Sequence, residues 1–327
     1  MKLSEKIYTT ILIIIMVVIP ILLIVALILS FLTAKNMANP KSYDSSEIIE
    51  DDAKGVSTLF DLHKYIKNGP MIVEELTTID NELVEYEIWG KKSNDKFVIL
   101  VHGMYNSRKR MYKYAKIWND MGYNAIAFDG RGWSSNAKLG KCTLGYKEPR
   151  LVQEIYLDLV KKYKTQEIGL HGESMGGATV FNWVKQYRKF TPIKFIVSEA
   201  GYMNFRIPAI TGMGRHNLPW WLSSALYPFV KIWLLTFGIN LWKGSVGKKD
   251  IRNWFDMPKL LIHSKSDDVV IWSEYQRIKK MFDKERVEFN KFEVEKAQHV
   301  RKLTDKNIQK EWVERLKKFI KEVESEK

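Results

Sequence analysis

A serine between glycines is the clearest chemical feature of this sequence. Residues 171–177 read HGESMGG, follow a strand-like stretch and lead into the apolar residues 178–183, which are typical of a buried helix. Gly172 and Gly176 allow a strand-to-helix turn that is too tight for side chains. Such a turn lifts the Ser174 hydroxyl above a sheet edge, where a base can take its proton. By itself the pattern is also compatible with a glycine-rich turn that carries an incidental serine.

The elements around this turn alternate between strands and helices. Strands are expected at residues 72–78, 83–89, 96–101, 124–128, 193–197, 260–262 and 287–293, beside the one that enters the turn. Helices are expected at residues 56–66, 109–121, 151–164 and 305–323. The hydrophobic content of 46% supports a sizeable core. The alternation indicates an α/β protein with a mainly parallel central sheet flanked by helices on both faces.

Several landmarks follow one another at the ends of these strands. They are His102-Gly103-Met104, Asp129-Gly130-Arg131-Gly132, Gly172-Glu173-Ser174-Met175-Gly176-Gly177, Ser266-Asp267-Asp268-Val269-Val270 and Gln298-His299. Their order resembles the α/β-hydrolase superfamily over residues 71–327, and most of all its membrane-anchored bacterial serine hydrolases of unassigned substrate. The resemblance implies the α/β-hydrolase fold with a helical cap inserted at about residues 203–256.

The resemblance also implies a catalytic triad. The superfamily order of nucleophile, acid and base is met by Ser174, Asp267 and His299. Histidine is the side chain suited to activating a serine near neutral pH. His299 is therefore the expected general base, with His216 or His263 as the alternatives among the six histidines.

The acid of a triad orients the imidazole and stabilises its cation. Asp267 precedes Val270 by three residues, as in the H-x-x-x-D-x-x-V stretch of the resembling family. Ser264 stands where many relatives have glycine, which is a departure from that pattern. Asp268 is adjacent and chemically equivalent. Glu199 is a more remote candidate, whose simpler interpretation is a strand-end carboxylate paired with a lysine.

Acyl transfer builds negative charge on a carbonyl oxygen. A backbone N–H group aimed at that oxygen contributes about 3–4 kcal/mol. By resemblance, the two donors of this oxyanion hole are the backbone N–H groups of Met104 and Met175. Only the two backbones take part, so the methionine side chains are free to line an acyl pocket.

The expected cap is rich in aromatic residues. Between residues 201 and 255 these include Trp220, Trp221, Tyr227, Phe229, Trp233, Phe237, Trp242 and Trp254. One interpretation is a lid for an apolar acyl or aryl group, or a lid that dips into the membrane surface. The other is plain packing of the cap helices. Lysines among the aromatics favour membrane proximity; they are Lys231, Lys243, Lys248 and Lys249.

The N-terminus carries a long apolar run. Residues 11–32 contain no charge, and these 22 residues suffice to cross a bilayer core, which needs about 20. A cleavable signal peptide has an apolar core of only about 7–15 residues, so an uncleaved transmembrane signal anchor over residues 11–33 is favoured. Residues 1–10 then form a cytoplasmic head and residues 34–70 a juxtamembrane segment. The expected location is the cell membrane, crossed once, with the domain of residues 71–327 outside the cytoplasm.

The composition narrows the functional classes that are open to this protein. The formal charge of +14 comes from 52 basic and 38 acidic residues, but the lysines are scattered and no nucleic-acid-binding pattern is present. The charge is therefore interpreted as a match to an anionic lipid or polymer rather than to nucleic acid. The single cysteine, Cys142, excludes an intramolecular disulfide framework. With no Walker loop, dinucleotide fingerprint or metal-ligand cluster, no cofactor and no metal are expected.

The expected function is hydrolysis of a carboxylic ester, through an acyl-enzyme on Ser174 and with water as second substrate. A thioesterase or a peptidase on the same scaffold stays open, and so does a non-catalytic, membrane-anchored binding module. Dehalogenases of the superfamily carry an aspartate where this chain has Ser174, so dehalogenase chemistry is disfavoured. The physiological substrate, the acyl length and the oligomeric state are left open.

Overall fold

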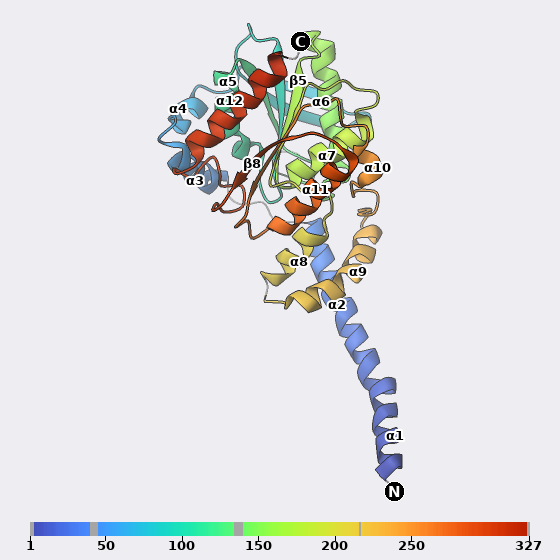
Figure 1. Cartoon of the computed structure of the whole chain (residues 1–327). Coiled ribbons are helices and arrows are strands. Elements are labelled where there is room, and N and C mark those ends of the chain that lie inside the picture. Colours follow the sequence, from blue (N-terminus) through green and yellow to red (C-terminus); the bar gives the residue numbers. More distant parts are fainter. Residues whose placement is uncertain (1–2, 40–44, 134–139, 216, 326–327) are drawn as a thin grey trace.

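A single sheet of eight strands forms the centre of the domain. The computed structural model describes residues 3–39, 45–133, 140–215 and 217–325. The strands are β1 (Ile72–Thr77), β2 (Leu83–Trp89), β3 (Lys96–Val101), β4 (Tyr123–Phe128), β5 (Ile168–Glu173), β6 (Ile196–Glu199), β7 (Lys259–Ser264) and β8 (Asn290–Val294). Their order is β1-β2-β4-β3-β5-β6-β7-β8. β2 pairs antiparallel with β1 and β4, and all other neighbours are parallel, so the mainly parallel sheet is confirmed (Figure 1).

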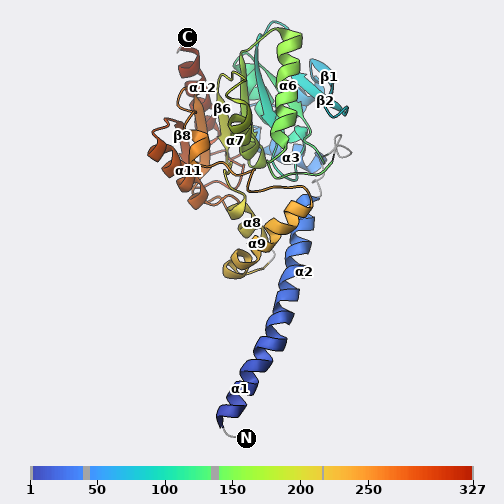
Figure 2. The same ribbon diagram turned by 90° about the vertical axis from the view of Figure 1, so that its right-hand side faces the viewer.

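Helices cover both faces of the sheet, because its central strands are buried on both sides. One face packs against α6 (Glu148–Tyr163), α7 (Met175–Tyr187) and α11 (Trp272–Glu285). The other packs against α3 (Ser45–Val56), α4 (Leu62–Lys67), α5 (Tyr112–Asp120) and α12 (Gln309–Ser325). Figure 1 shows the sheet between these two layers, and Figure 2 shows the face that α6 and α7 cover.

The prediction of one helix over residues 56–66 is wrong. α3 ends at Val56 and α4 starts at Leu62, with a turn between them. Asp61 has an extended backbone, and its carboxylate accepts a hydrogen bond from the Lys64 N–H at 3.0 Å. An N-cap residue of this kind starts a new helix, so α4 begins at Leu62 instead of continuing α3. A 3-10 turn, η2 (Arg108–Met111), likewise precedes α5.

Two further helices form the cap at the edge of the sheet. α8 (Arg206–Gly214) and α9 (Trp220–Thr236) follow β6, and the short α10 (Lys248–Ile251) leads back to β7. Both α8 and α9 contribute to a third apolar cluster, which also contains Met175 at the start of α7. The cap therefore lies over the end of the sheet at which Ser174 is found.

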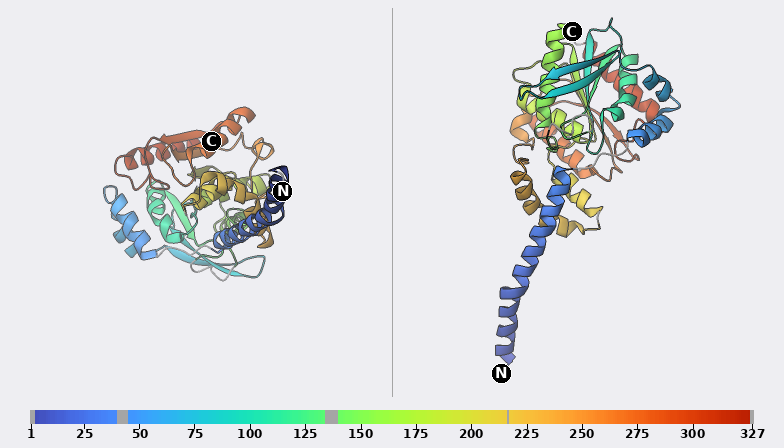
Figure 3. Two further views of the ribbon diagram at one scale, coloured as in Figure 1. Left: turned by 90° about the horizontal axis from the view of Figure 1, so that it is seen from below. Right: turned by 180° about the vertical axis from the view of Figure 1, so that it is seen from behind.

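The N-terminal apolar run forms a helical rod that leaves the domain beside the cap (Figure 3). It consists of α1 (Leu3–Ile13), the π-helical turn η1 (Ile14–Val18) and α2 (Ile19–Ala38). Pro20 lacks the N–H that would bond four residues back, and the π turn beside it, in which the Ile19 N–H donates to Ile14 O, absorbs this break. Lys6–Ala38 is long and apolar enough to cross a membrane, with a hydropathy of 3.7 over an unburied window. This length suits an anchor or a signal sequence.

Candidate active site

Ser174 forms the turn between β5 and α7. Its backbone has φ 57° and ψ −116°, a conformation that residues with a side chain rarely adopt. The Ser174 N–H donates to Glu199 O at 2.8 Å, which ties the turn to the end of β6. The surrounding backbone thus holds a strained residue that presents its Oγ at the carboxyl edge of the sheet.

Close backbone contacts explain the glycines around this serine. A Cβ on Gly172 would lie 2.2 Å from Gly176 O, and one on Gly176 would lie 1.9 Å from Val101 O. Both distances are far below any van der Waals contact, so neither position accepts a side chain. The tight turn predicted from the glycine spacing is therefore present.

The three residues expected to form a triad lie in one hydrogen-bonded row. His299 Nε2 is 2.9 Å from Ser174 Oγ, and His299 Nδ1 is 2.8 Å from Asp267 Oδ2. Asp267 lies in the loop after β7 and His299 in the loop after β8, and in a parallel sheet these loops meet at the same edge. With Nδ1 donating to the carboxylate, Nε2 is left as the acceptor for the serine hydroxyl.

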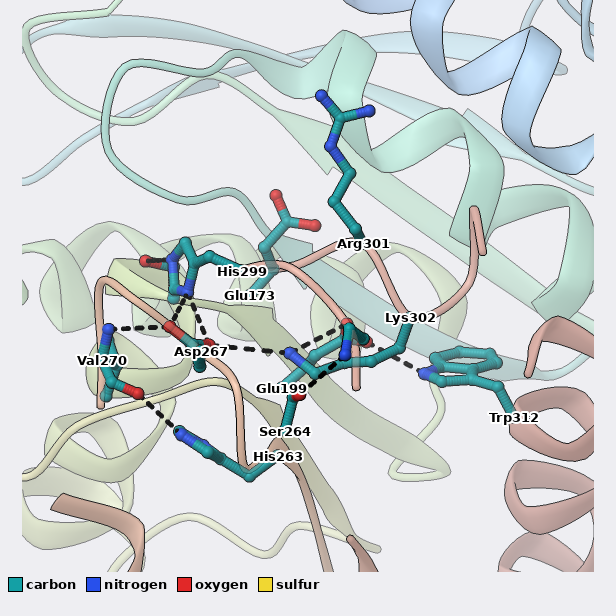
Figure 4. A network of polar contacts seen from close by, with 12 residues as sticks. Glu173, Glu199, His263, Ser264, Asp267, Val270, His299, Arg301, Lys302 and Trp312 are labelled. Carbon is teal, nitrogen blue, oxygen red and sulfur yellow. Dashed lines mark hydrogen bonds and ion pairs between the residues drawn. The ribbon is translucent and has the colours of Figure 1, made fainter. Parts of the chain in front are cut away.

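Asp267 is fixed by its own loop as well as by His299. Its Oδ1 accepts hydrogen bonds from the N–H groups of Val269, at 3.0 Å, and Val270, at 2.9 Å. Burial alone would raise the pKa of Asp267, but the charge and hydrogen bond of His299, helped by the charge of Lys302, hold it lower, at about 2. The carboxylate is therefore ionised at neutral pH. Figure 4 shows Asp267 with Val270, His299 and Lys302 around it.

The described alternatives for the acid and the base of the triad, Asp268 and His263, lie outside the hydrogen-bonded row. Asp268 is 2.5 Å from Arg215, and its side chain is 67% exposed. His263 is buried on β7, where its Nε2 lies 2.8 Å from Val270 O, and burial lowers its pKa to about 4. His216 lies outside the described residues. Among the histidines that the structure describes, His299 is the one hydrogen-bonded to the Ser174 hydroxyl.

Glu199 ends β6 and lies beside the row rather than in it. Its Oε2 accepts a hydrogen bond from Trp312 Nε1 at 3.0 Å, and its Oε1 is 3.9 Å from Lys302 Nζ. The same Nζ is 3.8 Å from Asp267 Oδ2, and all of these charged groups are buried. The interpretation of Glu199 as a strand-end carboxylate paired with a lysine is confirmed (Figure 4).

A second buried ionic cluster, which the sequence did not predict, lies behind the serine turn. Glu173 is fully buried, 3.6 Å from Arg110 Nε and 3.5 Å from Lys113 Nζ, and its carboxylate accepts a hydrogen bond from Tyr114 OH at 2.9 Å. Asp52 of α3 lies 2.8 Å from Arg110 and 3.3 Å from Lys113. Burial opposes ionisation of Glu173, but Lys113 and then Arg110 outweigh it and lower its pKa. The cluster thus joins α3, η2 and α5 to the end of β5.

The sequence held one signal for this cluster. Lys113 stands four residues before Ile117 and therefore on the same face of α5. A lysine on the apolar face of a helix needs a buried anionic partner. Glu173, placed at the end of a buried strand, was the candidate that this signal points to.

A cavity of about 940 Å³ opens beside Ser174 and His299. Its apolar wall comes from the sheet edge and the cap, and it includes Met104, Met175, Tyr202, Phe205 and Pro208. Its charged wall includes Arg110, Arg215 and Arg301, while Met37 of α2 lines it from the N-terminal helix. Within the described residues, no group of three or more His, Cys, Asp or Glu side chains could hold a metal ion.

The two expected oxyanion-hole residues both line this cavity. Met175 follows Ser174 directly. Met104 follows Gly103, where an added Cβ would lie 3.2 Å from Ser174 Cβ, so the loop after β3 abuts the serine. Among the described residues, the backbone N–H groups of Met104 and Met175 have no protein acceptor.

A mainly parallel sheet that raises a serine on a strained strand-to-helix turn is the architecture of the α/β-hydrolase fold, and the chain has this fold. The family described as "Serine aminopeptidase, S33" matches residues 92–231. The uncharacterized protein YqkD of Bacillus subtilis (strain 168) is 26% identical over 184 residues, which make up 55% of this chain. The match spans 58% of the length of that curated relative.

Solved structures show the same fold. An esterase from Pyrococcus furiosus matches with a TM-score of 0.58 and 26% identity, over 77% of this chain and 90% of the esterase. An acylaminoacyl peptidase from Pyrococcus horikoshii matches with a TM-score of 0.59 and 17% identity, over 76% of this chain and 41% of the peptidase. The family model and these two structures are thus of serine hydrolases of the esterase or peptidase type.

Proposed function

We propose that the chain is a serine hydrolase that cleaves a carboxylic ester through an acyl-enzyme on Ser174. The observation that carries this proposal is the row in which His299 lies 2.9 Å from Ser174 Oγ and 2.8 Å from Asp267. His299 Nε2 takes the hydroxyl proton as Oγ attacks the carbonyl carbon, and Asp267 stabilises the imidazolium that forms. His299 then gives this proton to the departing alcohol. Water repeats the two steps on the acyl-enzyme and releases the acid.

The carbonyl oxygen becomes negatively charged in each half of this reaction. We assign its stabilisation to the backbone N–H groups of Met104 and Met175, which line the cavity without a protein acceptor among the described residues. Each such donor is worth about 3–4 kcal/mol of transition-state energy. No metal or cofactor is required for this chemistry.

The apolar wall of the cavity favours an ester substrate. The apolar wall around Met175, Tyr202 and Phe205 suits an acyl chain. An aminopeptidase must also bind the ammonium group of its substrate with a carboxylate. Among the described residues, three carboxylates line the cavity. Asp268 pairs with Arg215, and Asp51 pairs with Arg301. The exposed Glu47 is the remaining candidate for this role. The likeness to an esterase at 26% identity supports the same choice.

The proposal extends to the location of the enzyme. Residues 11–33 would cross the cell membrane once as an uncleaved anchor, with residues 1–10 in the cytoplasm. The hydrolase domain of residues 71–327, including its cap at about residues 203–256, would then lie outside. The apolar rod Lys6–Ala38 supports this arrangement by its length and composition.

Turnover of matched esters and amides tests the proposal. The full chain in detergent micelles is given p-nitrophenyl esters of increasing acyl length and the corresponding p-nitroanilides. Ester turnover is expected to fall at least about 1,000-fold in Ser174→Ala, because the nucleophile is lost. The exposed Ser57→Ala serves as the control and keeps its rate. Faster cleavage of the anilides would favour a peptidase, and a folded protein without any turnover would favour a binding module.

A further inference from the structure

The cap helix α9 is apolar on two opposite faces. Its inner face is buried, and Leu226, Tyr227, Val230 and Leu234 on this face belong to the third apolar cluster. Its outer face is exposed and consists of Trp221, Ala225, Pro228, Ile232 and Leu235, which we call the outer stripe. These residues recur every three or four positions, as one side of a helix does. Trp221 is 70% exposed and Ile232 is 54% exposed, so no described residue covers the stripe.

A soluble surface helix rarely has this composition. A helix that is apolar all round is normally buried on all sides, by protein or by lipid. The 17 residues of α9 include a single charged side chain, Lys231. Its amine lies 3.6 Å from the ring centre of Trp242, which is itself 53% exposed. Exposed tryptophans and lysines beside an apolar surface are typical of the boundary between a membrane and water.

The N-terminal helix fixes where this surface lies. α2 and α9 pack side by side (Figures 2 and 3). The Phe31 ring lies 5.2 Å from that of Trp233 and 6.0 Å from that of Phe237. The α2 residues buried at this level are small and four positions apart; they are Ser30, Ala34 and Ala38. Small residues let two helices approach closely. The outer stripe is therefore attached directly to the helix that is apolar enough to cross a membrane.

The height of α9 along α2 matches a bilayer surface. The 22 uncharged residues 11–32 extend about 33 Å at about 1.5 Å per residue, close to the hydrocarbon thickness of about 30 Å. Phe31, which contacts Trp233, stands at the end of this run. The C-terminal end of α9, which carries Trp233, thus lies where the hydrocarbon ends and the headgroups begin.

We propose that the outer stripe of α9 is seated in the headgroup region of the membrane leaflet from which α2 emerges. The lipid surface is the occupant because the stripe adjoins the membrane-type helix at the level of its boundary. Exposed indole and aliphatic side chains enter this region of a bilayer readily. The cap is then a second membrane contact in addition to the anchor.

This docking also indicates a substrate class, a step that rests on the proposed esterase function. Met37 lines the cavity and stands five residues beyond Leu32, or about 8 Å along the helix. The cavity therefore lies just above the level at which lipid esters join their acyl chains to the headgroup. We infer that the substrate is an acyl ester lipid that enters from this leaflet.

Spin-label accessibility tests the docking directly. The full chain is reconstituted in nanodiscs of phosphatidylcholine and phosphatidylglycerol, with a nitroxide at Trp221→Cys. The control label is at Phe190→Cys, which is 78% exposed and precedes β6, at the sheet edge away from Ser174. The native Cys142 is buried, and burial raises its pKa, so the unlabelled parent checks that it stays unreactive.

The label at position 221 is expected to collide with oxygen but to be shielded about tenfold from an aqueous nickel chelate, relative to position 190. Equal nickel collision rates at the two positions overturn the docking. Shielding from both oxygen and nickel, lost in discs that hold one chain, means a second copy covers the stripe and overturns it as well. Ile232→Cys repeats the measurement if the label at position 221 disturbs the fold.

Activity separates this proposal from the esterase itself. In Ile232→Ser with Trp221→Ser, hydrolysis of a monoacylglycerol in nanodiscs is expected to fall about tenfold while p-nitrophenyl acetate turnover is unchanged, since only lipid access is lost. Phe190→Ser changes neither rate. An equal loss on both substrates contradicts entry of the substrate from the leaflet. If the parent turns over no ester at all, the esterase proposal fails, while the label depth still decides the docking.

Discussion

The amine of Lys302 lies 3.8 Å from Oδ2 of Asp267, inside the protein and beside the carboxylate that holds His299. The same amine lies 3.9 Å from Glu199, so one buried cation serves two buried carboxylates. A cation in this position keeps Asp267 ionised, but it also opposes positive charge on His299. Lys302 is thus placed to limit how strongly the imidazolium is stabilised.

Replacing Lys302 with methionine is expected to destabilise the fold by about 3–5 kcal/mol, because Glu199 and Asp267 lose their buried cation. The double variant Lys302→Met with Glu199→Gln is expected to recover part of this loss, because it leaves one buried carboxylate fewer without a partner. Thermal unfolding measures both variants. The control is Lys318→Met, whose side chain is 71% exposed. A Lys302→Met protein of parental stability would show that this amine does not stabilise the two carboxylates.

The adjacent aspartates provide a matched pair of variants. Asp267→Asn is expected to lower kcat by about 10⁴-fold, because an amide neither fixes the tautomer of His299 nor stabilises its cation. Asp268→Asn is expected to leave kcat within about twofold, since its exposed side chain contacts Arg215 on the rim of the cavity. Steady-state kinetics on one short ester compares the two. Similar losses in both variants would remove the distinction between the two acids.

The serine turn predicts a large difference between two glycine variants. Gly176→Ala places a methyl group 1.9 Å from Val101 O, so it is expected to lose more than about 4 kcal/mol of folding free energy or to fail to fold. Gly214→Ala in α8 meets nothing within 4 Å and is expected to be neutral or stabilising by up to about 1 kcal/mol. Thermal unfolding followed by circular dichroism measures both. A Gly176→Ala protein of parental stability would contradict the backbone contact.

Buried His171 predicts acid sensitivity. Its Nδ1 accepts a hydrogen bond from Trp118 Nε1 at 3.1 Å, and burial lowers its pKa to about 3. In the unfolded chain this imidazole takes up a proton near its ordinary pKa of about 6.5, whereas in the folded protein it does so only near 3. The folded state is therefore fully stable above about pH 6.5 and loses stability as the pH falls toward 3.

The melting temperature should therefore fall between pH 7 and pH 4.5, and less steeply in His171→Gln, which has no proton to gain. His63→Gln removes an exposed histidine and serves as the control. Parallel slopes in the parent and His171→Gln would show that this imidazole does not drive the acid loss.

The site residues that could be located from the sequence are those whose neighbours in the chain define the local backbone conformation. Glycines at positions 172 and 176 imply the turn at Ser174, because only glycine fits there. Strands that end before Asp267 and His299 bring those loops to one edge of the sheet. The mainly parallel sheet was predicted because short apolar runs, typical of strands, alternate with longer amphipathic runs, typical of helices.

The residues that could not be located depend on contacts between distant segments. Asp52 and Arg110 meet only because α3 packs on η2, and residues 56–66 had been expected to form one helix. The burial of Lys302 depends on two carboxylates from distant segments, Glu199 at the end of β6 and Asp267 in the loop after β7. In α9 the sequence contains two apolar stripes, but only the packing against α2 and the core shows which one faces outward.

Labelling of the full chain with a fluorophosphonate probe, followed by peptide mapping, tests the activated serine most directly. Because His299 lies 2.9 Å from Ser174 Oγ, one probe per chain is expected on Ser174. Ser174→Ala should remove the label, and His299→Ala should slow its formation by at least about 100-fold. A folded parent that stays unlabelled and leaves p-nitrophenyl acetate intact, or a label on another serine, would contradict the proposed hydrolase.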